Sequence, residues 1–374
     1  MSLKLLKMLE EDLLYVLALQ HAKGIGDINA KKLISHCGSA KNVFKEKKQT
    51  LKKINGIGTF KIKNLFDEIN LKAAEKELDY ILKNNVEFLY FLDENYPFKL
   101  QHCIDAPILL FKKGAFNLKN QPVISIVGTR NITSYGRDFC EKLLNDLIPY
   151  NPVIVSGFAY GVDICAHKTA IKNNLQTVGV LAHGLEEVYP KTHKKYMTSM
   201  CENGGFLTDF WHDEKIIREN FLKRNRIVAG ISEATIIIES AEKGGSLVTA
   251  DIANSYHRDV FAVPGRTTDT YSKGCNELIK NNKAAILTSA NDLIEMLNLK
   301  MVDESPKVIQ KQLFVELTSD EQLVYDFLLN NGKELMDIIS LHCNLPVHQI
   351  ATILFQMEMK GVVKPLPGKL FEAV

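Results

Sequence analysis

VISIVGTRNITSYG, residues 123–136, is the stretch that decides the fold of this chain. It opens with five residues that are apolar apart from Ser125, and such a run predicts a parallel strand covered on both faces. Similar short runs recur along the chain, with helical segments between most of them. The alternation predicts an α/β fold, an extended Rossmann-like, doubly wound core. The predicted strands are 86–92, 123–127, 153–155, 177–181, 235–238, 260–263 and 285–287, and the predicted helices are 135–147, 161–173, 193–201 and 246–256.

Each predicted core strand is followed by glycine or by polar residues. Ligands of open α/β sheets bind beyond the carboxyl ends of the strands, where helix N-termini supply donors for an anion and glycine allows close backbone approach. One such loop is equally explained by turn geometry, but five at one sheet edge predict a single pocket for phosphate groups. The loop residues are Gly128-Thr129-Arg130, Ser156-Gly157, Ala182-His183-Gly184 with Lys191, Glu239 with Gly244-Gly245-Ser246, and Pro264-Gly265-Arg266.

Two familiar phosphate-binding motifs do not occur in these loops. The first turn lacks GxGxxG, and GxxxxGK[ST] is found nowhere in the chain. The sequence therefore supports neither a nicotinamide cofactor nor ATP hydrolysis, and we expect no cofactor.

A second basic element, residues 221–226, contains an aromatic side chain. Phe221 beside Arg224, Asn225 and Arg226 is a combination typical of single-strand binding, with bases stacked on the ring and phosphates on the cations. The alternative interpretation makes Phe221 a core residue and one arginine a surface salt bridge.

Residues 1–84 are predicted to be helical, and they carry 16 Lys against 10 acidic residues. Two Gly-Ile-Gly turns, beginning at Gly24 and Gly56, each separate two helical segments, which predicts a helix-hairpin-helix-like module. Such turns can direct backbone N–H groups at a DNA phosphate, although a plain pair of packed helices needs the same glycines.

The core domain is predicted to span residues 85–299, followed by a polar linker (300–315) and a winged-helix-like domain (316–374). From residue 301 onward the chain has 6 Lys, no Arg and 10 acidic residues. This acidic balance favours a protein-contact or regulatory role over DNA binding. The predicted elements of the last domain are helices 319–330 (with Ser319 as N-cap), 335–343 and 347–360, and a hairpin of 362–364 with 370–372.

The whole chain has 374 residues, which suits two or three domains, and a formal net charge of only +2. Its seven cysteines are scattered without a CxxC pair, which argues against a disulfide framework or structural zinc and for a reducing compartment. Charges interrupt the apolar N-terminus, so neither a signal peptide nor a membrane span is predicted. We therefore expect a cytoplasmic protein without a metal, in which His167 and His257 are hydrogen-bonded structural residues.

The core resembles the DNA-processing protein A family, also known as Smf or DprA. The resemblance runs through most of 122–299, in segments that keep the family's order: ISIVGTRNITSYG, IVSGFAYGVDICAH, VGVLAHGLEEVYPKTH, FLKRNRIVAG, GGSLVTADIA, RDVFAVPG and GCNELIKNNKAAILTSANDL. The sequence departs from the family pattern at Glu186, where Asp is usual, at Leu222-Lys223, where Pro is common, and at Ala182-His183, which replaces a more glycine-like stretch.

The resemblance implies a protein that binds single-stranded DNA without strong sequence preference and is not an enzyme. It also implies a homodimer that helps load the RecA recombinase on the strand during natural transformation and DNA processing. By position, Gly128, Thr129 and Arg130 would hold backbone phosphates, with Ser156 and Gly157 beside them. Lys191, Arg224 and Asn225 would extend the track, and Phe221, Gly244, Gly245 and Ser246 complete the predicted DNA-binding residues.

Two other function classes compete with this interpretation. Related Rossmann-like enzymes, the nucleoside-monophosphate phosphoribohydrolases, use a PGGxGTxxE loop with a catalytic Glu. Here residues 243–251 have Leu247 in place of the second Gly and Asp251 in place of the Glu. General acid–base catalysis needs a carboxylate within reach of the substrate, and Asp251 is expected about two turns into a helix. The third class is a pure adaptor with a vestigial pocket, which predicts no salt-sensitive DNA binding.

Overall fold

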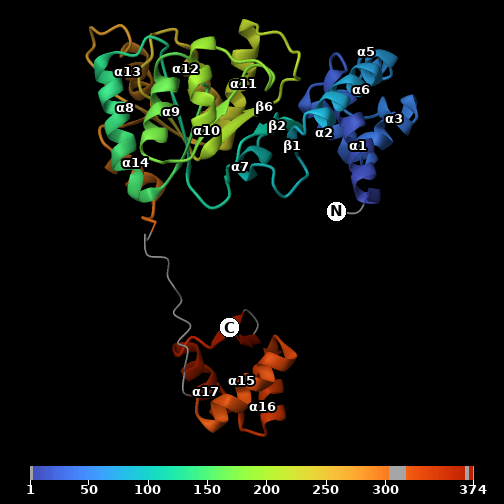
Figure 1. The fold of residues 1–374 in the computed structure, drawn as a ribbon, viewed down its shortest axis with the longest axis vertical. Helices are drawn as coiled ribbons and strands as arrows, with labels where there is room; N and C mark the ends of the chain where they lie inside the picture. The colour runs from blue at the N-terminus through green and yellow to red at the C-terminus, as the bar shows by residue number, and fades with distance from the viewer. Residues whose placement is uncertain (1–2, 303–316, 367–369, 374) are drawn as a thin grey trace. The chain divides into compact units, whose positions relative to one another are not determined.

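The computed structural model describes residues 3–302, 317–366 and 370–373, and the chain divides into two compact units, Met1–Val302 and Asp303–Val374 (Figure 1). The first unit is a mixed α/β structure around one large, mainly parallel sheet, as predicted. The second is a small unit of helices and a three-stranded sheet.

The large sheet has the strand order β1-β2-β6-β5-β4-β3-β7-β8-β9. Neighbouring strands from β6 to β9 in this order pair in parallel, whereas β1 and β2 extend the β6 edge in antiparallel fashion. The strands are β1 (Glu87–Tyr90), β2 (Leu109–Lys113), β3 (Val123–Val127), β4 (Val153–Ser156), β5 (Thr177–Val180), β6 (Gly204–Thr208), β7 (Ala234–Ile237), β8 (Asp259–Ala262) and β9 (Ala285–Ile286).

All the strands predicted from apolar runs are present, but β2 and β6 were not predicted. β6 begins with Gly204-Gly205, and glycine is depleted in strands, so its sequence does not indicate one. The predicted helix 193–201 is divided between a 3-10 segment and α10. The core helices are α7 (Phe98–Gln101), α8 (Ser134–Asp146), α9 (Val162–Lys172), α10 (Met197–Glu202), α11 (Arg218–Ile231), α12 (Gly245–Ser255), α13 (Lys273–Lys280) and α14 (Ala290–Leu297), with 3-10 segments η1 (Ile148–Tyr150) and η2 (Lys191–Tyr196).

Helices cover both faces of the central strands, because alternate side chains of a strand point to opposite faces. Val153 and Val155 pack with residues of α7, α11, α12 and α13, whereas Ile154 packs with α8, α9 and α14. The polar Ser125 of β3 is satisfied inside this core, since its hydroxyl donates to the Val228 carbonyl of α11 at 2.7 Å.

The winding direction of the sheet changes at β3. From β3 the chain passes through α8 to β4 and then to β5 and β6 on one side, and it returns through α11 to β7 on the other side. β3 therefore pairs with both β4 and β7 in parallel. The loops that leave β3 and β7 diverge at such a switch point and open a crevice at the carboxyl ends of the strands.

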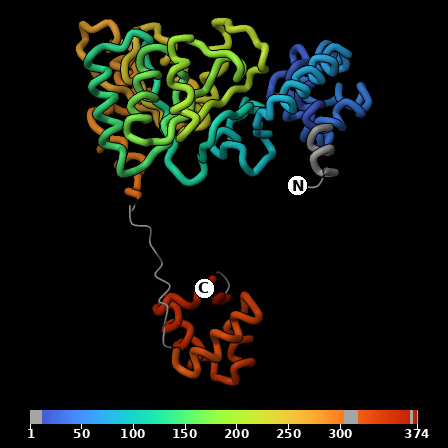
Figure 2. Tube along the Cα trace, in the orientation of Figure 1, coloured from blue at the N-terminus to red at the C-terminus, as the bar shows by residue number. Residues whose placement is uncertain are grey.

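The N-terminal helices pack against the β1–β2 end of the sheet (Figures 1 and 2). Their apolar cluster continues onto Ile108, Leu109 and Phe111. Gly24 and Gly56 adopt φ values of +84° and +88° shortly before α2 and α5, a backbone conformation that favours glycine. The helices are α1 (Leu3–His21), α2 (Asp27–Cys37), α3 (Ala40–Lys45), α4 (Lys48–Leu51), α5 (Thr59–Leu65) and α6 (Glu68–Lys83).

The C-terminal unit has its own apolar core. Its first helix is capped by Thr318 and not by Ser319 as predicted, because Thr318 and Glu321 form a reciprocal capping box. No single described helix is long and apolar enough to cross a membrane, and by length and composition alone the pair α16–α17, bent by 109°, passes that test together. The elements are α15 (Ser319–Asn331), β10 (Glu334–Leu335), α16 (Met336–Cys343), α17 (Val347–Met359), β11 (Val363–Leu366) and β12 (Leu370–Ala373).

Candidate functional site

A cavity of about 440 Å³ lies at the carboxyl ends of β3, β4 and β7, where the winding direction changes; we call it the switch-point cavity. Its walls are the loops after these three strands and one face of α11. The lining residues are Val127, Gly128, Thr129, Arg130, Gly157, Ala159, Asp163, Arg218, Phe221, Leu222, Arg224, Asn225, Val228, Ser240, Ala241, Gly244, Gly245, Ser246 and Thr249.

The loop after β3 is fixed to the end of β7 by Glu239. The Thr129 amide donates to the Glu239 carbonyl at 2.7 Å, and the Glu239 carboxylate accepts from both the amide and the hydroxyl of Thr133. Gly128 is required by this close packing, because a Cβ there would lie 2.9 Å from the Glu239 carbonyl oxygen. The backbone that carries Arg130 is therefore rigidly placed.

The loop after β7 leads directly into α12, whose N-terminus opens into the cavity. Gly244 is the N-cap and no side chain caps the first turn, while a Cβ at Gly245 would meet nothing within 4 Å. The Ser246 hydroxyl donates to the Ser240 hydroxyl at 2.9 Å. Uncapped N–H groups and the positive end of the helix dipole make this position suitable for an anion.

Arg224 lies beneath the cavity floor with little exposure. Its guanidinium donates to the Gly157 carbonyl at 2.6 Å and to the Val180 carbonyl. Burial lowers its pKa to about 10, which Asp163 partly opposes, so the side chain stays charged at neutral pH. Burial has the opposite effect on the carboxyl group of Asp163: it raises the pKa, while the charge of Arg224 lowers it. The floor thus combines a fixed cation with a buried carboxyl beside it.

Arg130 and Phe221 form the exposed wall of the cavity. The Arg130 guanidinium lies 5.3 Å from the centre of the Phe221 ring, a cation–π distance. Phe221 is half-buried and meets the Tyr189 ring edge-on, with 5.6 Å between centroids. Phe221 therefore belongs to the cavity wall and not to the core, and its ring is available beside an exposed cation.

Ten of the twelve predicted DNA-binding residues line this cavity; Ser156 and Lys191 do not. Ser156 is fully buried, and its hydroxyl donates to the Ile126 carbonyl at 2.6 Å. Lys191 is exposed at the start of η2. The prediction that all five loops form one pocket is wrong. Pro264-Gly265-Arg266 lines a separate hollow beside Tyr135 and Tyr271, and the loop after β5 does not line the cavity.

Two residues that line the cavity were not predicted from the sequence, and Arg226, a cation that was predicted beside Phe221, does not line it. Arg218 and Ser240 line the cavity. Ser240 directly follows Glu239 in the loop after β7, so its position after a strand could have indicated it, whereas Arg218 begins α11 well after the end of β6 and no such signal indicates it. Arg226 is bound to Asp27 and Asp209, at 2.9 and 2.5 Å. It therefore forms the salt bridge that the alternative interpretation of residues 221–226 allowed for one arginine.

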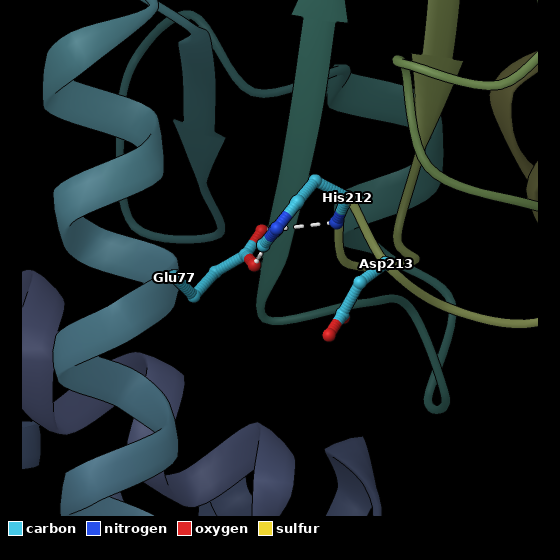
Figure 3. A group of neighbouring side chains, drawn as sticks. All are labelled: Glu77, His212 and Asp213. Carbon is cyan, nitrogen blue, oxygen red and sulfur yellow. Dashed lines mark hydrogen bonds and ion pairs between the residues drawn. The ribbon is translucent and has the colours of Figure 1, made fainter.

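A group of potential metal ligands lies away from the cavity lining, where α6 meets the loop after β6 (Figure 3). Ligand atoms of Glu77, His212 and Asp213 lie within 4.8 Å of one another, and their distance along the chain explains why no sequence pattern indicated them. Glu77 accepts hydrogen bonds from the His212 ring and its amide, and the ring stacks on Tyr80 at 3.9 Å. These contacts join the N-terminal helices to the core.

The predicted structural role of His167 is confirmed. Its Nδ1 is hydrogen-bonded to the Thr177 hydroxyl at 2.7 Å, and the residue is fully buried. Burial lowers its pKa to about 3, with the charges of His193 and Arg224 contributing, so the ring is neutral at pH 7.

Fold and cavity together define the class of protein: a doubly wound α/β protein with fixed cations and an open helix N-terminus at its switch point. The chain belongs to the DNA recombination-mediator protein A family (DprA/Smf), a family of DNA-processing proteins, and the model of that family matches residues 87–298. It is 31% identical over 316 residues to Protein Smf of Synechocystis sp., covering 83% of this chain and 78% of that protein. Protein Smf of Escherichia coli is 32% identical over 307 residues, covering 79% and 80%.

Two solved structures of DNA processing protein A are also similar. The Streptococcus pneumoniae protein gives a TM-score of 0.66 at 29% identity, covering 77% of this chain and 99% of that one. The Helicobacter pylori protein, whose structure is described as revealing a single-stranded DNA binding mode, gives 0.52 at 30% identity, covering 58% and 97%.

Proposed function

We propose that this protein binds single-stranded DNA without strong sequence preference in the switch-point cavity. The observation that carries the proposal is the exposed Arg130 guanidinium over the Phe221 ring, opposite the uncapped N-terminus of α12. Cations with an aromatic platform are the combination that binds single strands. The H. pylori relative supports the same ligand class.

Each part of the cavity has a distinct task in this mechanism. Arg130 and the first-turn N–H groups of α12 replace counterions at backbone phosphates. Arg224 adds a fixed positive charge from below and holds Gly157 in place. A base stacks on Phe221, and because every base has a π-face, such stacking is tolerant of sequence.

The cavity also favours a single strand over a duplex. Its volume of about 440 Å³ is enclosed by three loops and α11. A flexible strand can turn its phosphates inward and its bases onto one ring. Stiff paired strands cannot enter such a cavity, so duplex DNA is expected to compete poorly.

Further parts of the role follow from family resemblance. We propose a homodimer that passes the strand to the RecA recombinase during DNA processing and natural transformation, in the cytoplasm. In this scheme residues 1–84 are a helix-hairpin-helix-like module, 85–299 the DNA-binding domain, 300–315 a linker and 316–374 a winged-helix-like module with a protein-contact role. Most of the predicted linker lies outside the described residues.

Hydrolysis of nucleoside monophosphates is not favoured by the arrangement of carboxylates. Asp251 does not line the cavity and lies 3.0 Å from Lys283, and Glu239 is occupied by Thr133. Asp163 lines the cavity, but it is buried beside Arg224 and accepts a bond from the Ala159 amide. Release of a free base from a nucleotide by the purified chain would restore the enzyme interpretation.

The proposal is tested by fluorescence anisotropy of labelled oligo-dT across a salt series with a duplex competitor. Arg130→Ala is expected to weaken binding at least about tenfold and to make the log–log salt slope shallower by about 0.7. Arg266→Ala is the matched control, because Arg266 is an exposed arginine of the same sheet edge that lines a different hollow. Equal losses in both variants, or none in either, would move the site elsewhere, with the Lys-rich N-terminal hairpins next to be tested.

A further inference from the structure

A second hollow, of about 780 Å³, lies between α8 and α9; we call it the α8–α9 groove. Arg130 lines both the groove and the switch-point cavity. Ala159, in the cavity, is followed along the chain by Tyr160 and Gly161, which line the groove. The two spaces are therefore contiguous across the sheet edge, and a chain molecule that leaves the cavity over Arg130 enters the groove.

Cations dominate the walls of the groove. Arg137 stands on α8, while Lys168 and Lys172 stand four residues apart on α9 and so share one helix face. All three are exposed, and none takes part in an ion pair within the described part of the chain. Glu141 is the one acidic residue among the lining side chains. The groove thus offers positive charge that the protein itself leaves uncompensated.

An aromatic side chain stands at the junction of cavity and groove. Tyr160 is 43% exposed, and its ring meets the His193 ring edge-on at 5.0 Å. The Thr192 hydroxyl donates to its hydroxyl at 3.4 Å. The ring is held in position by these contacts and remains accessible to a base.

The hollow on the other side of the cavity has the opposite electrostatic character. It lies between α2 and α11, has a volume of about 730 Å³ and shares Leu222 with the cavity. Among the described lining residues, Lys223 and Arg226 are the only lysine and arginine, and Arg226 is already bound to two carboxylates. A polyanion is repelled from such a wall and attracted to the groove. The acidic lining residues are Asp27, Asp105, Asp209 and Glu214.

We propose that the α8–α9 groove is the second segment of the DNA path. Phosphates of the strand that leaves the cavity over Arg130 contact Arg137, Lys168 and Lys172, and a base stacks on Tyr160 at the junction. The inference rests on the proposed function and extends its site. The eleven residues of α9 span about 16 Å, which is long enough for more than one phosphate of the strand.

The test measures affinity against strand length. Oligo-dT of about 6, 12 and 20 nucleotides, spanning the site sizes usual for single-strand binders, is titrated with the full chain and with Lys168→Ala/Lys172→Ala. Lys273→Ala/Lys280→Ala is the matched control, because both lysines are exposed on one helix, α13, and line neither the cavity nor the groove. Thermal melting verifies that each variant is folded.

The double groove variant is expected to bind the shortest strand within about twofold of the wild type and the longest about tenfold more weakly. Its salt slope for the longest strand becomes shallower by about 1.4, which corresponds to two lost phosphate contacts. The proposal is overturned if the groove variant and the control give the same affinities at every length, or if the loss is equal for short and long strands.

The two proposals fail in different ways in this experiment. If the wild type binds none of the strands, including the longest, the function proposed for the cavity is wrong. If the wild type binds the shortest strand and Arg130→Ala does not, but the groove variant matches the wild type at all lengths, only the groove inference is wrong.

Discussion

The two sides of α11 put the same residue type to different uses. Arg224 faces the switch-point cavity, where backbone carbonyls hold its guanidinium and no carboxylate forms an ion pair with it among the described residues. Two residues further on, Arg226 faces the N-terminal helices and is bound to Asp27 and Asp209. Arg224 therefore contributes a buried positive charge beneath the cavity without an ion pair, whereas the charge of Arg226 is neutralised by two carboxylates. The first side is suited to binding an anion and the second to joining two parts of the chain.

The largest effect is expected for Arg224→Ala. The substitution leaves two buried carbonyls without their donor and Asp163 without its neighbouring cation. Each buried acceptor left unpaired costs about 1–3 kcal/mol, so we expect a loss of about 3–5 kcal/mol. Urea unfolding measures the free energy difference. Arg218→Ala, at the exposed start of α11 in the same cavity, is the control and should change stability by less than about 0.5 kcal/mol. A stability loss no greater than the control's would show that the buried guanidinium is not needed for folding.

Arg226→Ala should lower the stability of the protein without weakening its binding to DNA. Asp27 and Asp209 lose a shared partner in a mostly buried setting, so we expect a loss of about 2–3 kcal/mol in unfolding free energy. Affinity for oligo-dT should remain within about twofold of the wild type, because the charge of Arg226 is already neutralised. A marked loss of DNA affinity with unchanged stability would contradict the contrast between the two sides of α11.

Acid is expected to lower the stability of the folded core through His167, which is buried on α9 and does not line the cavity. Burial lowers the pKa of this histidine in the folded state to about 3, below its ordinary value of 6.5. Between these values the unfolded chain binds a proton that the folded chain does not, so stability is fully present above about pH 6.5 and falls as the pH is lowered. The loss is about 2 kcal/mol at about pH 5.

The variant His167→Asn tests this dependence by urea unfolding at a series of pH values. The asparagine keeps a polar group towards Thr177 but does not titrate, so the curve should become flatter between about pH 6.5 and 5. His257→Asn, in the turn after α12, is the control and should keep the wild-type slope. Unchanged acid sensitivity in His167→Asn would assign the effect to other groups.

The smallest effect is expected for Phe221→Leu. Leucine keeps the apolar volume but removes the ring, so the loss is confined to base stacking, about 1 kcal/mol or roughly fivefold in affinity for oligo-dT. Phe98→Leu, which replaces an exposed ring outside the cavity lining, should leave binding unchanged. If both substitutions have the same small effect, Phe221 does not stack on DNA.

The parallel strands other than β6 could be predicted because burial on both faces requires apolar residues that are near neighbours in sequence. The stretch 123–127 coincides with β3, and the glycine loops after β3, β4 and β7 do meet at one cavity. Ser156 illustrates the limit of the same rule. It ends a strand, as a ligand-binding serine would, but its side chain points inward to the Ile126 carbonyl, and that direction depends on the register with β3.

The order of the strands in the sheet could not be predicted from the sequence for a similar reason. All five predicted loops lie at the carboxyl edge, yet only those next to the β3–β7 switch line the cavity. The loop that carries Lys191 follows β5, two strands away from β3. Pairing between strands is a long-range contact, and no local pattern specifies which strands become neighbours.

The sequence by itself determined the α/β class, the positions of the parallel strands other than β6, the glycine-rich loops and the family, because local apolar runs and ordered motifs encode them. The tertiary structure alone decided which cations remain available. Asp27 and Arg226 are 199 residues apart, and only packing of the N-terminal helices on the core brings them together. Arg130, Arg137, Lys168 and Lys172 remain accessible because packing brings no carboxylate into an ion pair with them among the described residues. The residue type alone sets the charge of a side chain, but whether that charge is neutralised depends on neighbours that only folding brings to it.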